Sequence, residues 1–413
     1  MSTEHDHWLE KSNHTRLKHL ILQYYLQNWS RILADASFYN NQEDIYYIDG
    51  FAGRGEFLDG DQGSPLIALE EMEKVQNKYN EKYPENPLRF HIINIENSDS
   101  NFRKLEEIKG SISTSVRIQN ICGNFLEESK KILVRSSLQN SACFWFVDPF
   151  YGARDFSFND VTDLMFFPNG SKRLRKEILI NFMTFNIVRF IRYDKEQPFI
   201  LRFLGANSYN EVISSGTNNT NKLEESIITF YKTRLREKGV YVLAQRIQCR
   251  DPKDLHAEHI YFHMVHCSHN ERALLEMRES FVKVKEQKKL FEKELNGNQI
   301  DFFEFAGLDE NSLEFSHQQL VNFIRNNFGF NKPFLLHSFF TLSLQEINQS
   351  NSVICEMLHT IWKQGVISIN NLDGKKRRKP FNNIIKNWKS IEVTLLREKT
   401  SHSAPQQEQL TLF

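Results

Sequence analysis

The segment from Tyr46 to Gly55 places an acidic residue and two closely spaced glycines directly after an apolar stretch (YYIDGFAGRG). Because glycine carries no Cβ and accepts unusual backbone angles, such a strand-to-loop turn lets the backbone lie against a small ligand. The spacing does not fit the phosphate-binding loop, which ends in Gly-Lys-Ser/Thr. It does not fit the dinucleotide fingerprint either, which has a third glycine and an acidic residue about 20 positions later. The alternative to a ligand loop is an ordinary glycine turn.

The pattern Asp49-x-Phe51-x-Gly53-x-Gly55 resembles motif I of the class I S-adenosylmethionine (SAM) methyltransferases, whose loop holds the amino-acid end of SAM. The resemblance implies that Gly53 and Gly55 line the methionine portion of SAM and that Phe51 belongs to the same site. Asp49 is expected to accept a hydrogen bond from a backbone amide of its own loop or from the ammonium group of the ligand.

Two polar residues follow later apolar stretches, and open α/β sheets bind ligands beyond the carboxyl ends of their strands. Glu96 closes the stretch 90–95. A carboxylate there suits ribose, because it accepts two hydrogen bonds from a diol. Asn124 follows Gly123, where an amide or the backbone can read the adenine amino group. Both are interpreted as cofactor-binding residues; the alternatives are an exposed strand-end carboxylate and a turn residue.

The segment Asp148-Pro149-Phe150-Tyr151 follows the apolar stretch 143–147. It resembles the Asp/Asn-Pro-Pro-Tyr/Phe motif of enzymes that methylate exocyclic amines, with phenylalanine in place of the second proline. In such enzymes the carboxylate or amide accepts from the target nitrogen while the aromatic ring stacks on a flipped base. Asp148, Phe150 and Tyr151 are therefore the predicted catalytic residues, and methylation at adenine N6 or cytosine N4 stays open. The alternative is a buried Asp148 that fixes its own loop. No Pro-Cys pair is present as a nucleophile for cytosine C5 chemistry.

Composition limits the classes of protein further. The chain has 413 residues and equal numbers of basic and acidic residues, 52 each, so any contact with nucleic acid must come from a local patch. Five scattered cysteines without a Cys-x-x-Cys pair argue against disulfides and a cysteine zinc site, and favour a reducing cytoplasm. The pairs His256/His259 and His263/His266 have a spacing that points to opposite faces of a strand, so no metal site is predicted. No signal peptide or long apolar run is recognised, which favours a cytoplasmic protein.

The elements that position these residues alternate between strand and helix. This order predicts an α/β, Rossmann-like, seven-stranded mixed sheet of the class I SAM methyltransferase type, whose last strand is antiparallel. The expected strands are 45–49, 90–96, 116–121, 143–147, 177–183, 240–247 and 259–267. We predict an α/β domain over 1–285 with a helical insertion at about 186–238, a helical connector over 286–335, a winged-helix-like domain over 336–398 and a flexible tail over 399–413.

The C-terminal part shows helices, a strand and an Asp-Gly turn, which together resemble a winged helix-turn-helix. The helices are expected at Ser343–Ile347 and Ser352–Gln364, each capped by its first serine. A basic run follows the turn and is interpreted as a wing that contacts phosphates without specifying sequence, or else as a solvated charge cluster. The run consists of Lys375, Lys376, Arg377, Arg378 and Lys379.

The chain ends in a segment that resembles the bacterial sliding-clamp-binding peptide, Gln-Leu-Ser/Asp-Leu-Phe. Its glutamine suits a small polar pocket, and its leucines and phenylalanine suit apolar clefts. The alternative is a terminus that packs on its own domain. The predicted partner-binding residues are Gln409, Leu410, Leu412 and Phe413.

Taken together, these motifs resemble the three-Cys-motif partner protein (TcmP) family. The likeness spans roughly residues 14–280 and includes an N-terminal signature, His14-Thr15-x-x-Lys18-His19-x-Ile21-Leu22-x-x-Tyr25-x-x-x-Trp29. It implies a bacterial, methyltransferase-like protein that works with a separate protein carrying three cysteines. One departure is Arg54, where family members often have proline.

The leading hypothesis is a SAM-dependent methyltransferase that acts on nucleic acid, with DNA as the expected acceptor. The alternative is a non-catalytic adaptor or binding subunit with the same fold. Phe150 in place of the second proline and the unusual Arg54 favour the adaptor, whereas the glycine loop and Glu96 favour the enzyme. A hydride-transferring Rossmann enzyme fits the glycine spacing poorly.

Overall fold

The structure is a computed structural model. It describes residues 13–40, 44–139, 141–149, 152–167, 175–192, 197–213, 219–249, 260–294, 316–347, 349–374, 380–381 and 388–396. The chain divides into two units, residues 1–312 and 313–413. Their boundary falls inside the segment 286–335 that the sequence predicts to connect two domains.

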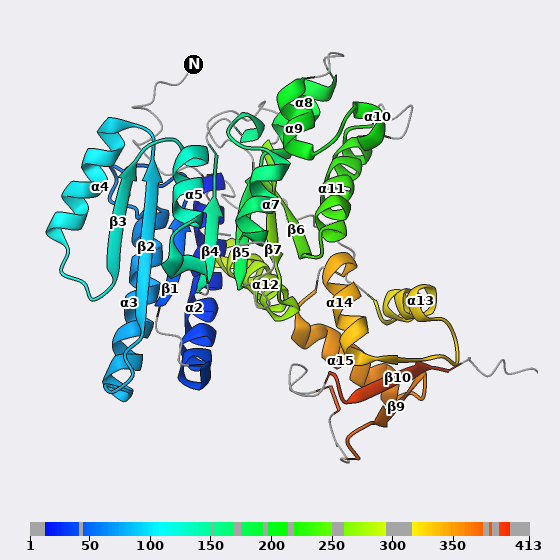
Figure 1. Ribbon diagram of the computed structural model, residues 1–413. Helices are drawn as coiled ribbons and strands as arrows, with labels where there is room; N and C mark the ends of the chain where they lie inside the picture. Colours follow the sequence, from blue (N-terminus) through cyan, green and yellow to red (C-terminus); the bar gives the residue numbers. More distant parts are fainter. Residues whose placement is uncertain are drawn as a thin grey trace, which may run out of the picture. The chain divides into compact units, whose positions relative to one another are not determined.

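Unit 1 is built on one seven-stranded sheet with the order β3-β2-β1-β4-β5-β7-β6 (Figure 1). The first five strands in the chain run parallel, and β7 is antiparallel to both of its neighbours. This confirms the predicted seven-stranded mixed sheet. The strands are β1 (Asp44–Asp49), β2 (Arg89–Glu96), β3 (Arg117–Cys122), β4 (Ala142–Val147), β5 (Lys176–Phe182), β6 (Tyr241–Cys249) and β7 (Ile260–Ser268).

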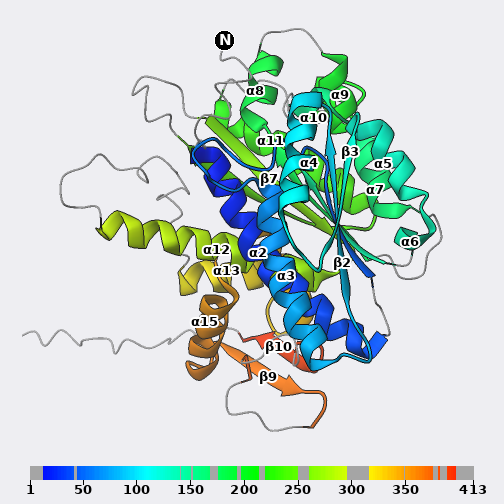
Figure 2. The same ribbon diagram turned by 90° about the vertical axis from the view of Figure 1, so that its left-hand side faces the viewer.

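Helices cover both faces of this sheet (Figure 2). On one face lie α2 (Asn13–Asn40), α3 (Ser64–Lys82) and α12 (Glu271–Glu294), and α4 (Asp99–Ser111) contacts β2 and β3. The opposite face carries α5 (Phe125–Leu133), α6 (Ser136–Gln139), the short 3-10 helix η1 (Gly152–Arg154) and α7 (Phe158–Phe166). The buried side chains of α2 recur at helical spacing, which is why it packs along its whole length. They include Leu17, Ile21, Tyr25 and Trp29.

The segment between β5 and β6 is helical, in agreement with the predicted insertion. It contains α8 (Thr184–Arg192), α9 (Pro198–Leu204), α10 (Tyr209–Val212) and α11 (Thr220–Glu237). Aromatic side chains join it to the sheet: the rings of Phe203 and Tyr231 stack with centroids 5.6 Å apart, and Phe182 of β5 contacts both. The insertion is therefore part of the same core.

A partly buried carboxylate fixes α2 to the sheet. Glu177 of β5 accepts hydrogen bonds from the Tyr25 hydroxyl and from Trp29 Nε1, the latter at 3.3 Å. His266 of β7 lies 3.1 Å from the same carboxylate through Nε2. His263 is also buried, with Nδ1 2.6 Å from the Thr184 hydroxyl oxygen. Both histidines thus bond to side chains of the fold; His256 and His259 lie outside the described residues.

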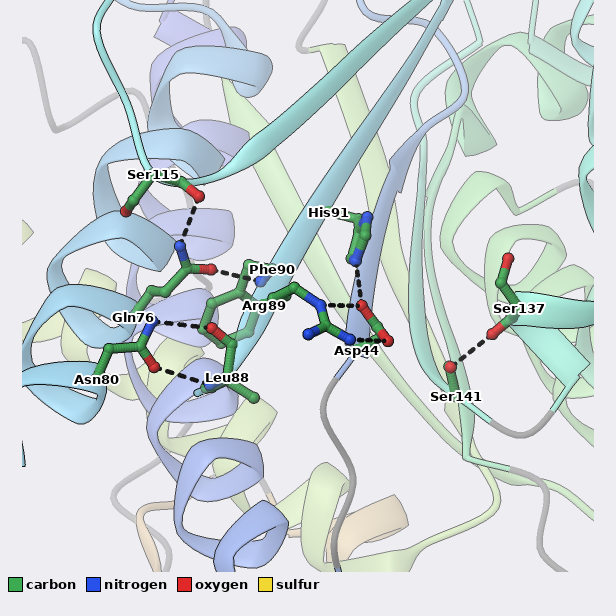
Figure 3. Close-up of polar contacts among 10 residues, drawn as sticks. All are labelled: Asp44, Gln76, Asn80, Leu88, Arg89, Phe90, His91, Ser115, Ser137 and Ser141. Atoms are coloured by element: carbon green, nitrogen blue, oxygen red, sulfur yellow. Dashed lines mark hydrogen bonds and ion pairs between the residues drawn. The ribbon is translucent and has the colours of Figure 1, made fainter. Parts of the chain in front are cut away.

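The amino-terminal edge of the sheet holds a second polar cluster (Figure 3). Asp44 of β1 accepts from Arg89 Nε at 3.0 Å and Nη2 at 2.9 Å, and His91 Nε2 lies 2.6 Å from the same carboxylate. On α3, Gln76 and Asn80 bond the backbone at the start of β2 through Phe90 and Leu88, respectively. These contacts fix where β2 begins beside β1.

Unit 2 has a three-stranded antiparallel sheet with the order β8-β10-β9. Its elements are α13 (His317–Phe328), β8 (Pro333–Leu335), α14 (Leu336–Glu346), α15 (Asn351–Lys363), β9 (Ile367–Asn371) and β10 (Ile391–Leu395).

The helix predicted at Ser352–Gln364 is present as α15, but both predicted cap residues and the start of the first helix are wrong. Ser343 lies buried inside α14 and donates to the Phe340 carbonyl at 3.0 Å, because the apolar face of this helix already begins at Leu336. The cap of α15 is Ser350, whose hydroxyl accepts from the Val353 amide at 3.1 Å, and not Ser352. No described helix in either unit is long and apolar enough to cross a membrane.

Candidate functional site

A cavity of about 790 Å³ lies at the carboxyl-terminal ends of the parallel strands. Its size is in the range of small-molecule sites. The wall is formed by residues that end or follow β1 to β5, together with the first turns of α2. The lining residues are His14, Thr15, Lys18, His19, Gly50, Phe51, Ala52, Gly53, Phe57, Gly63, Ser64, Ile95, Glu96, Asn97, Ser98, Asn101, Gly123, Asn124, Phe125, Asp148, Pro149, Asp155, Asn181 and Met183.

The loop after β1 is held open by its neighbours. The Gly50 amide donates to the Phe146 carbonyl at 2.9 Å, and the Ala52 amide donates to the Ile95 carbonyl at 3.0 Å. A Cβ on Gly50 would lie 2.6 Å from the ring of Phe125, so no side chain fits there. Gly53 has a φ of 64°, a left-handed conformation that favours glycine. Because neither glycine has a side chain, the backbone itself forms this part of the cavity wall.

Glu96 joins this loop to the end of β2. Its Oε2 accepts from the Gly53 amide and its Oε1 from the Ser98 amide, both at 2.7 Å. Burial raises the pKa of Glu96, while these amide donors act in the opposite direction. Each carboxylate oxygen can accept a second hydrogen bond. Hydrogen bonds from the Asn101 side chain and the Asn97 backbone lower the pKa of Glu96 as well, so groups of the chain itself hold this carboxylate on the cavity wall.

Two predicted cofactor residues do not line the cavity. Asp49 is fully buried and accepts from the Phe51 amide at 3.2 Å and the Tyr47 hydroxyl at 3.1 Å. Of the two partners expected for Asp49, the structure thus provides the backbone amide. Burial raises the pKa of Asp49 to about 7, although hydrogen bonds from Ser64, Phe51 and Tyr47 oppose the shift.

Gly55 packs away from the cavity, since a Cβ there would lie 2.9 Å from Leu105 of α4. Arg54 is not among the lining residues either. Phe51 does line the cavity, and its ring centroid lies 5.0 Å from that of Phe125. Of the glycines in the motif, Gly53 is thus the one at the cavity.

Asn124 is both a helix cap and a cavity residue. Its side-chain oxygen accepts from the Leu126 amide at 2.9 Å, which caps α5, and the residue remains exposed on the cavity wall. The predicted turn role is therefore present.

Asp148 forms the centre of a charged cluster at the end of β4. Its Oδ2 lies 2.5 Å from Lys18 Nζ, and its Oδ1 accepts from Asn181 Nδ2 at 2.7 Å. Burial alone would raise the pKa of Asp148, but Lys18 and Asn181 outweigh it and hold the pKa below its usual value. Asp148 is therefore an ionised hydrogen-bond acceptor and a weak proton acceptor. The other predicted catalytic residues, Phe150 and Tyr151, lie outside the described residues.

The sequence motifs did not assign a site role to the start of α2. Thr15, Lys18 and His19 are almost fully buried, and all three line the cavity together with His14. The signal was present in the sequence: polar residues at i and i+4 on an otherwise apolar helical face. Asn181 and Met183, at the end of β5, were missed as well.

The remaining predicted sites lie outside the described residues. They are the basic run Lys375–Lys379 and the terminal peptide Gln409–Phe413. Among the residues that the structure does describe, no group of three or more His, Cys, Asp or Glu side chains is placed to hold a metal ion.

Comparison with known proteins gives matches to solved structures alone. No protein-family model and no curated protein matches the chain. The plantazolicin methyltransferase BamL, in complex with a triazolic desmethylPZN analogue and SAH, is 9% identical, with a TM-score of 0.28 over 65% of this chain and 95% of that one. Loganic acid methyltransferase with SAH is 10% identical, with a TM-score of 0.24 over 71% of this chain and 89% of that one.

A Staphylococcus aureus protein with the provisional designation caffeoyl-CoA O-methyltransferase is also similar. It is 10% identical, with a TM-score of 0.26 over 57% of this chain and 81% of that one. All three TM-scores are below 0.5. The description of the fold therefore rests on the order and directions of the strands in this chain.

Proposed function

We propose that this protein is a SAM-dependent methyltransferase that acts on nucleic acid. The observation that carries the proposal is the junction of Gly53 and Glu96 on the wall of a large cavity at the carboxyl ends of β1 and β2. In an open α/β sheet this is where ligands bind. The cavity of about 790 Å³ is large enough for a nucleoside with an amino-acid arm.

The residues present fit SAM. Gly50 and Gly53 line the cavity beside Phe51, Glu96 presents a carboxylate that suits ribose hydroxyls, and Asn124 supplies an amide on the β3 side. When bound, SAM supplies a methyl group on a positively charged sulfur. The chain's own contribution is to orient the acceptor, a role that we assign to Asp148 on the cavity wall.

The proposal names nucleic acid, with DNA as the first choice, as the molecule that receives the methyl group. Its support is the order of elements in unit 2, helix-strand-helix-helix-strand-strand with β10 between β8 and β9, which is the order of a winged helix. The basic run Lys375–Lys379 belongs to the β9–β10 connection, where a wing would contact phosphates.

The likeness to the TcmP family adds the proposal of a three-cysteine partner protein in a bacterial cytoplasm. The terminal peptide with Gln409, Leu410, Leu412 and Phe413 adds a sliding clamp as a second protein partner. Both proposals rest on sequence patterns, and pull-down of the purified partner or clamp by the full chain, compared with a chain lacking 409–413, would test them.

A non-catalytic adaptor is the second candidate. One observation favours it: both oxygens of Asp148 already bond within the chain, to Lys18 and Asn181. An adaptor would not need a residue that orients a methyl acceptor. Measurements of cofactor binding and of methyl transfer therefore distinguish the two candidates.

Calorimetry with SAM and SAH tests the cofactor site. We expect Glu96→Gln to weaken SAH binding roughly 10- to 100-fold, the loss expected when charge-assisted hydrogen bonds are removed. Glu107→Gln is the matched control, since Glu107 is exposed on α4 and pairs with Lys104. Absence of SAM and SAH binding at high micromolar concentration would overturn the enzymatic proposal. Labelled methyl transfer to DNA, RNA or the partner then identifies the acceptor.

A further inference from the structure

A second cavity, of about 250 Å³, lies toward the amino-terminal ends of the strands, opposite to the candidate site. It is lined by residues in the first halves of β1, β2 and β3 and by the segment that leads from α5 into α6. The two cavities share no lining residue. The proposed function therefore does not account for the second one.

The register of the sheet places three of its lining residues in one row. Tyr46 of β1 pairs with His91 of β2, and His91 pairs with Arg117 of β3. The rings of Tyr46 and His91 stack with their centroids 4.4 Å apart. Asp44 holds His91 through Nε2 at 2.6 Å (Figure 3). The position of Arg117 beside this stack is thus fixed by the pairing of the strands.

The side chains that line this cavity carry positive charge. The guanidinium group of Arg117 has no hydrogen-bond or ion-pair partner in the part of the chain that the structure describes. Arg135 enters from the end of α5, and its Nη1 donates to the neutral Gln119 side chain at 2.8 Å. None of the described residues that line the cavity is an Asp or Glu. Two guanidinium groups therefore face a cavity whose lining offers them no carboxylate.

A buried lysine next to the cavity lacks a carboxylate partner as well. Lys176 of β5 is 2% exposed, and its Nζ donates to the carbonyl of Leu138, a lining residue, at 2.5 Å. Nζ also lies 3.1 Å from the sulfur of Cys143. Burial raises the pKa of the Cys143 thiol, although Lys176 acts in the opposite direction. Among the described residues, no carboxylate forms an ion pair with Lys176. Burying a charge is costly unless it is paired, so an anion in the adjoining cavity would stabilise this lysine.

We infer that the second cavity binds the phosphate group of a small phosphomonoester through the guanidinium groups of Arg117 and Arg135. A guanidinium group stays charged, and its planar fork of N–H donors matches the spacing of phosphate oxygens. A volume of about 250 Å³ is just below the usual range of small-molecule sites, so it suits a phosphate group with few further atoms. A phosphomonoester carries up to two negative charges, which complement the two arginines and the buried Lys176.

Calorimetric titration of the full chain tests the class of ligand. The probes are inorganic phosphate, glycerol 3-phosphate and dimethyl phosphate. We expect the first two to bind, and dimethyl phosphate to bind roughly 10-fold more weakly because it has a single negative charge and two free oxygens. Absence of saturable binding of inorganic phosphate and glycerol 3-phosphate at about 10 mM would overturn the inference. Equal affinity for dimethyl phosphate would overturn the assignment to a phosphomonoester.

Variants of the two arginines test the place of binding. Arg117→Met and Arg135→Met should each weaken the binding of glycerol 3-phosphate roughly 10-fold, the loss expected for a charged hydrogen bond. Arg117→Lys keeps the charge without the fork and should lose less. Arg103→Met is the matched control, because Arg103 is exposed on α4 and lines neither cavity, and its affinity should stay within about twofold of the parent.

Thermal unfolding gives a second readout in the same proteins. A ligand that binds the folded state raises the unfolding temperature, so glycerol 3-phosphate should stabilise the parent and Arg103→Met but not the double variant Arg117→Met/Arg135→Met. The unfolding temperatures without ligand show that each variant is folded. Parent-like affinity for glycerol 3-phosphate in the folded double variant would contradict the site.

Titration with SAH keeps this inference separate from the proposed function. The folded double variant should bind SAH with the affinity of the parent, because Arg117 and Arg135 do not line the candidate site. If the double variant loses the binding of SAH and of glycerol 3-phosphate together, the second cavity is not an independent site.

Discussion

Carboxylates lie at both the amino-terminal and the carboxyl-terminal edge of the sheet, where the strands begin and end, but their surroundings differ. At the amino-terminal edge, Asp44 is bonded by Arg89 and His91 (Figure 3), and Glu177 is bonded by side chains of α2 and β7. At the carboxyl-terminal edge, Glu96 and Asp148 also bond within the chain, but they line a cavity of about 790 Å³.

This difference in surroundings predicts that the first set of carboxylates stabilises the fold and the second set binds a ligand. A carboxylate whose partners come entirely from its own fold holds elements together, and its removal leaves buried donors without acceptors. A carboxylate that lines a cavity is also placed where a bound ligand can contact it. Removing a carboxylate at the amino-terminal edge should therefore lower stability without changing SAH affinity, whereas removing a carboxylate that lines the cavity should lower SAH affinity.

The largest effect is expected from Glu177→Ala. It leaves the Tyr25 hydroxyl, Trp29 Nε1 and His266 Nε2 without their shared acceptor, and each buried donor left unsatisfied costs about 1–3 kcal/mol. The measurement is the free energy of unfolding of unit 1 in urea. The exposed Glu81→Ala is the control and should change it by less than about 0.5 kcal/mol. A loss below about 1 kcal/mol would show that this edge does not hold α2.

The pH dependence of the free energy of unfolding should show that Asp49 is protonated more readily in the folded state. Its pKa in the folded state is raised to about 7 by burial, above the ordinary value of 3.8. The folded chain therefore binds a proton more tightly than the unfolded one. The stabilisation is complete below pH 3.8 and is lost as the pH rises toward 7, with a slope of at most about 1.4 kcal/mol per pH unit.

Asp49→Asn should remove this component of the pH profile. The measurement is unfolding free energy against pH for both proteins, with the difference between them as the readout because other groups cancel. An identical profile in the two proteins would mean that Asp49 is not protonated in the folded state.

A smaller effect is expected at the glycine loop. Gly50→Ala places a Cβ 2.6 Å from the Phe125 ring, and overpacking of this kind costs about 1–3 kcal/mol. Adding Phe125→Leu should recover part of the loss. Thermal unfolding of the single and double variants measures the coupling. If the losses of stability in the two single variants simply add up in the double variant, the contact between the new Cβ and the Phe125 ring is not the cause of the loss.

The smallest effect is expected from Arg89→Met at the amino-terminal edge. Arg89 and Asp44 have side chains that are 33% and 30% exposed, so solvent screens the pair and its loss should cost less than about 1 kcal/mol. SAH affinity should stay within twofold of the parent, as measured by calorimetry. A larger loss of affinity would mean that the two edges are coupled.

Local pattern predicted the sheet well. Apolar stretches ending in Asp49, Glu96 and Asp148 became strands β1, β2 and β4, because alternating strands and helices permit few topologies. In unit 2 the same reasoning placed α15 to within one residue but began α14 too late, because the buried face of that helix starts at Leu336 and not at Ser343. A short strand such as β8, with three residues, leaves too little pattern to recognise.

The sequence by itself determined which residues could sit at the ends of strands, because strand periodicity and glycine chemistry are local. Only the tertiary structure decided that Gly55 and Asp49 turn from the cavity, while Lys18 enters it from a helix 130 positions before Asp148. Helical spacing shows that polar residues share a face, but it does not show what that face covers. The packing of α2 over the loop after β1 supplies that information, since it brings a buried charge to its partner.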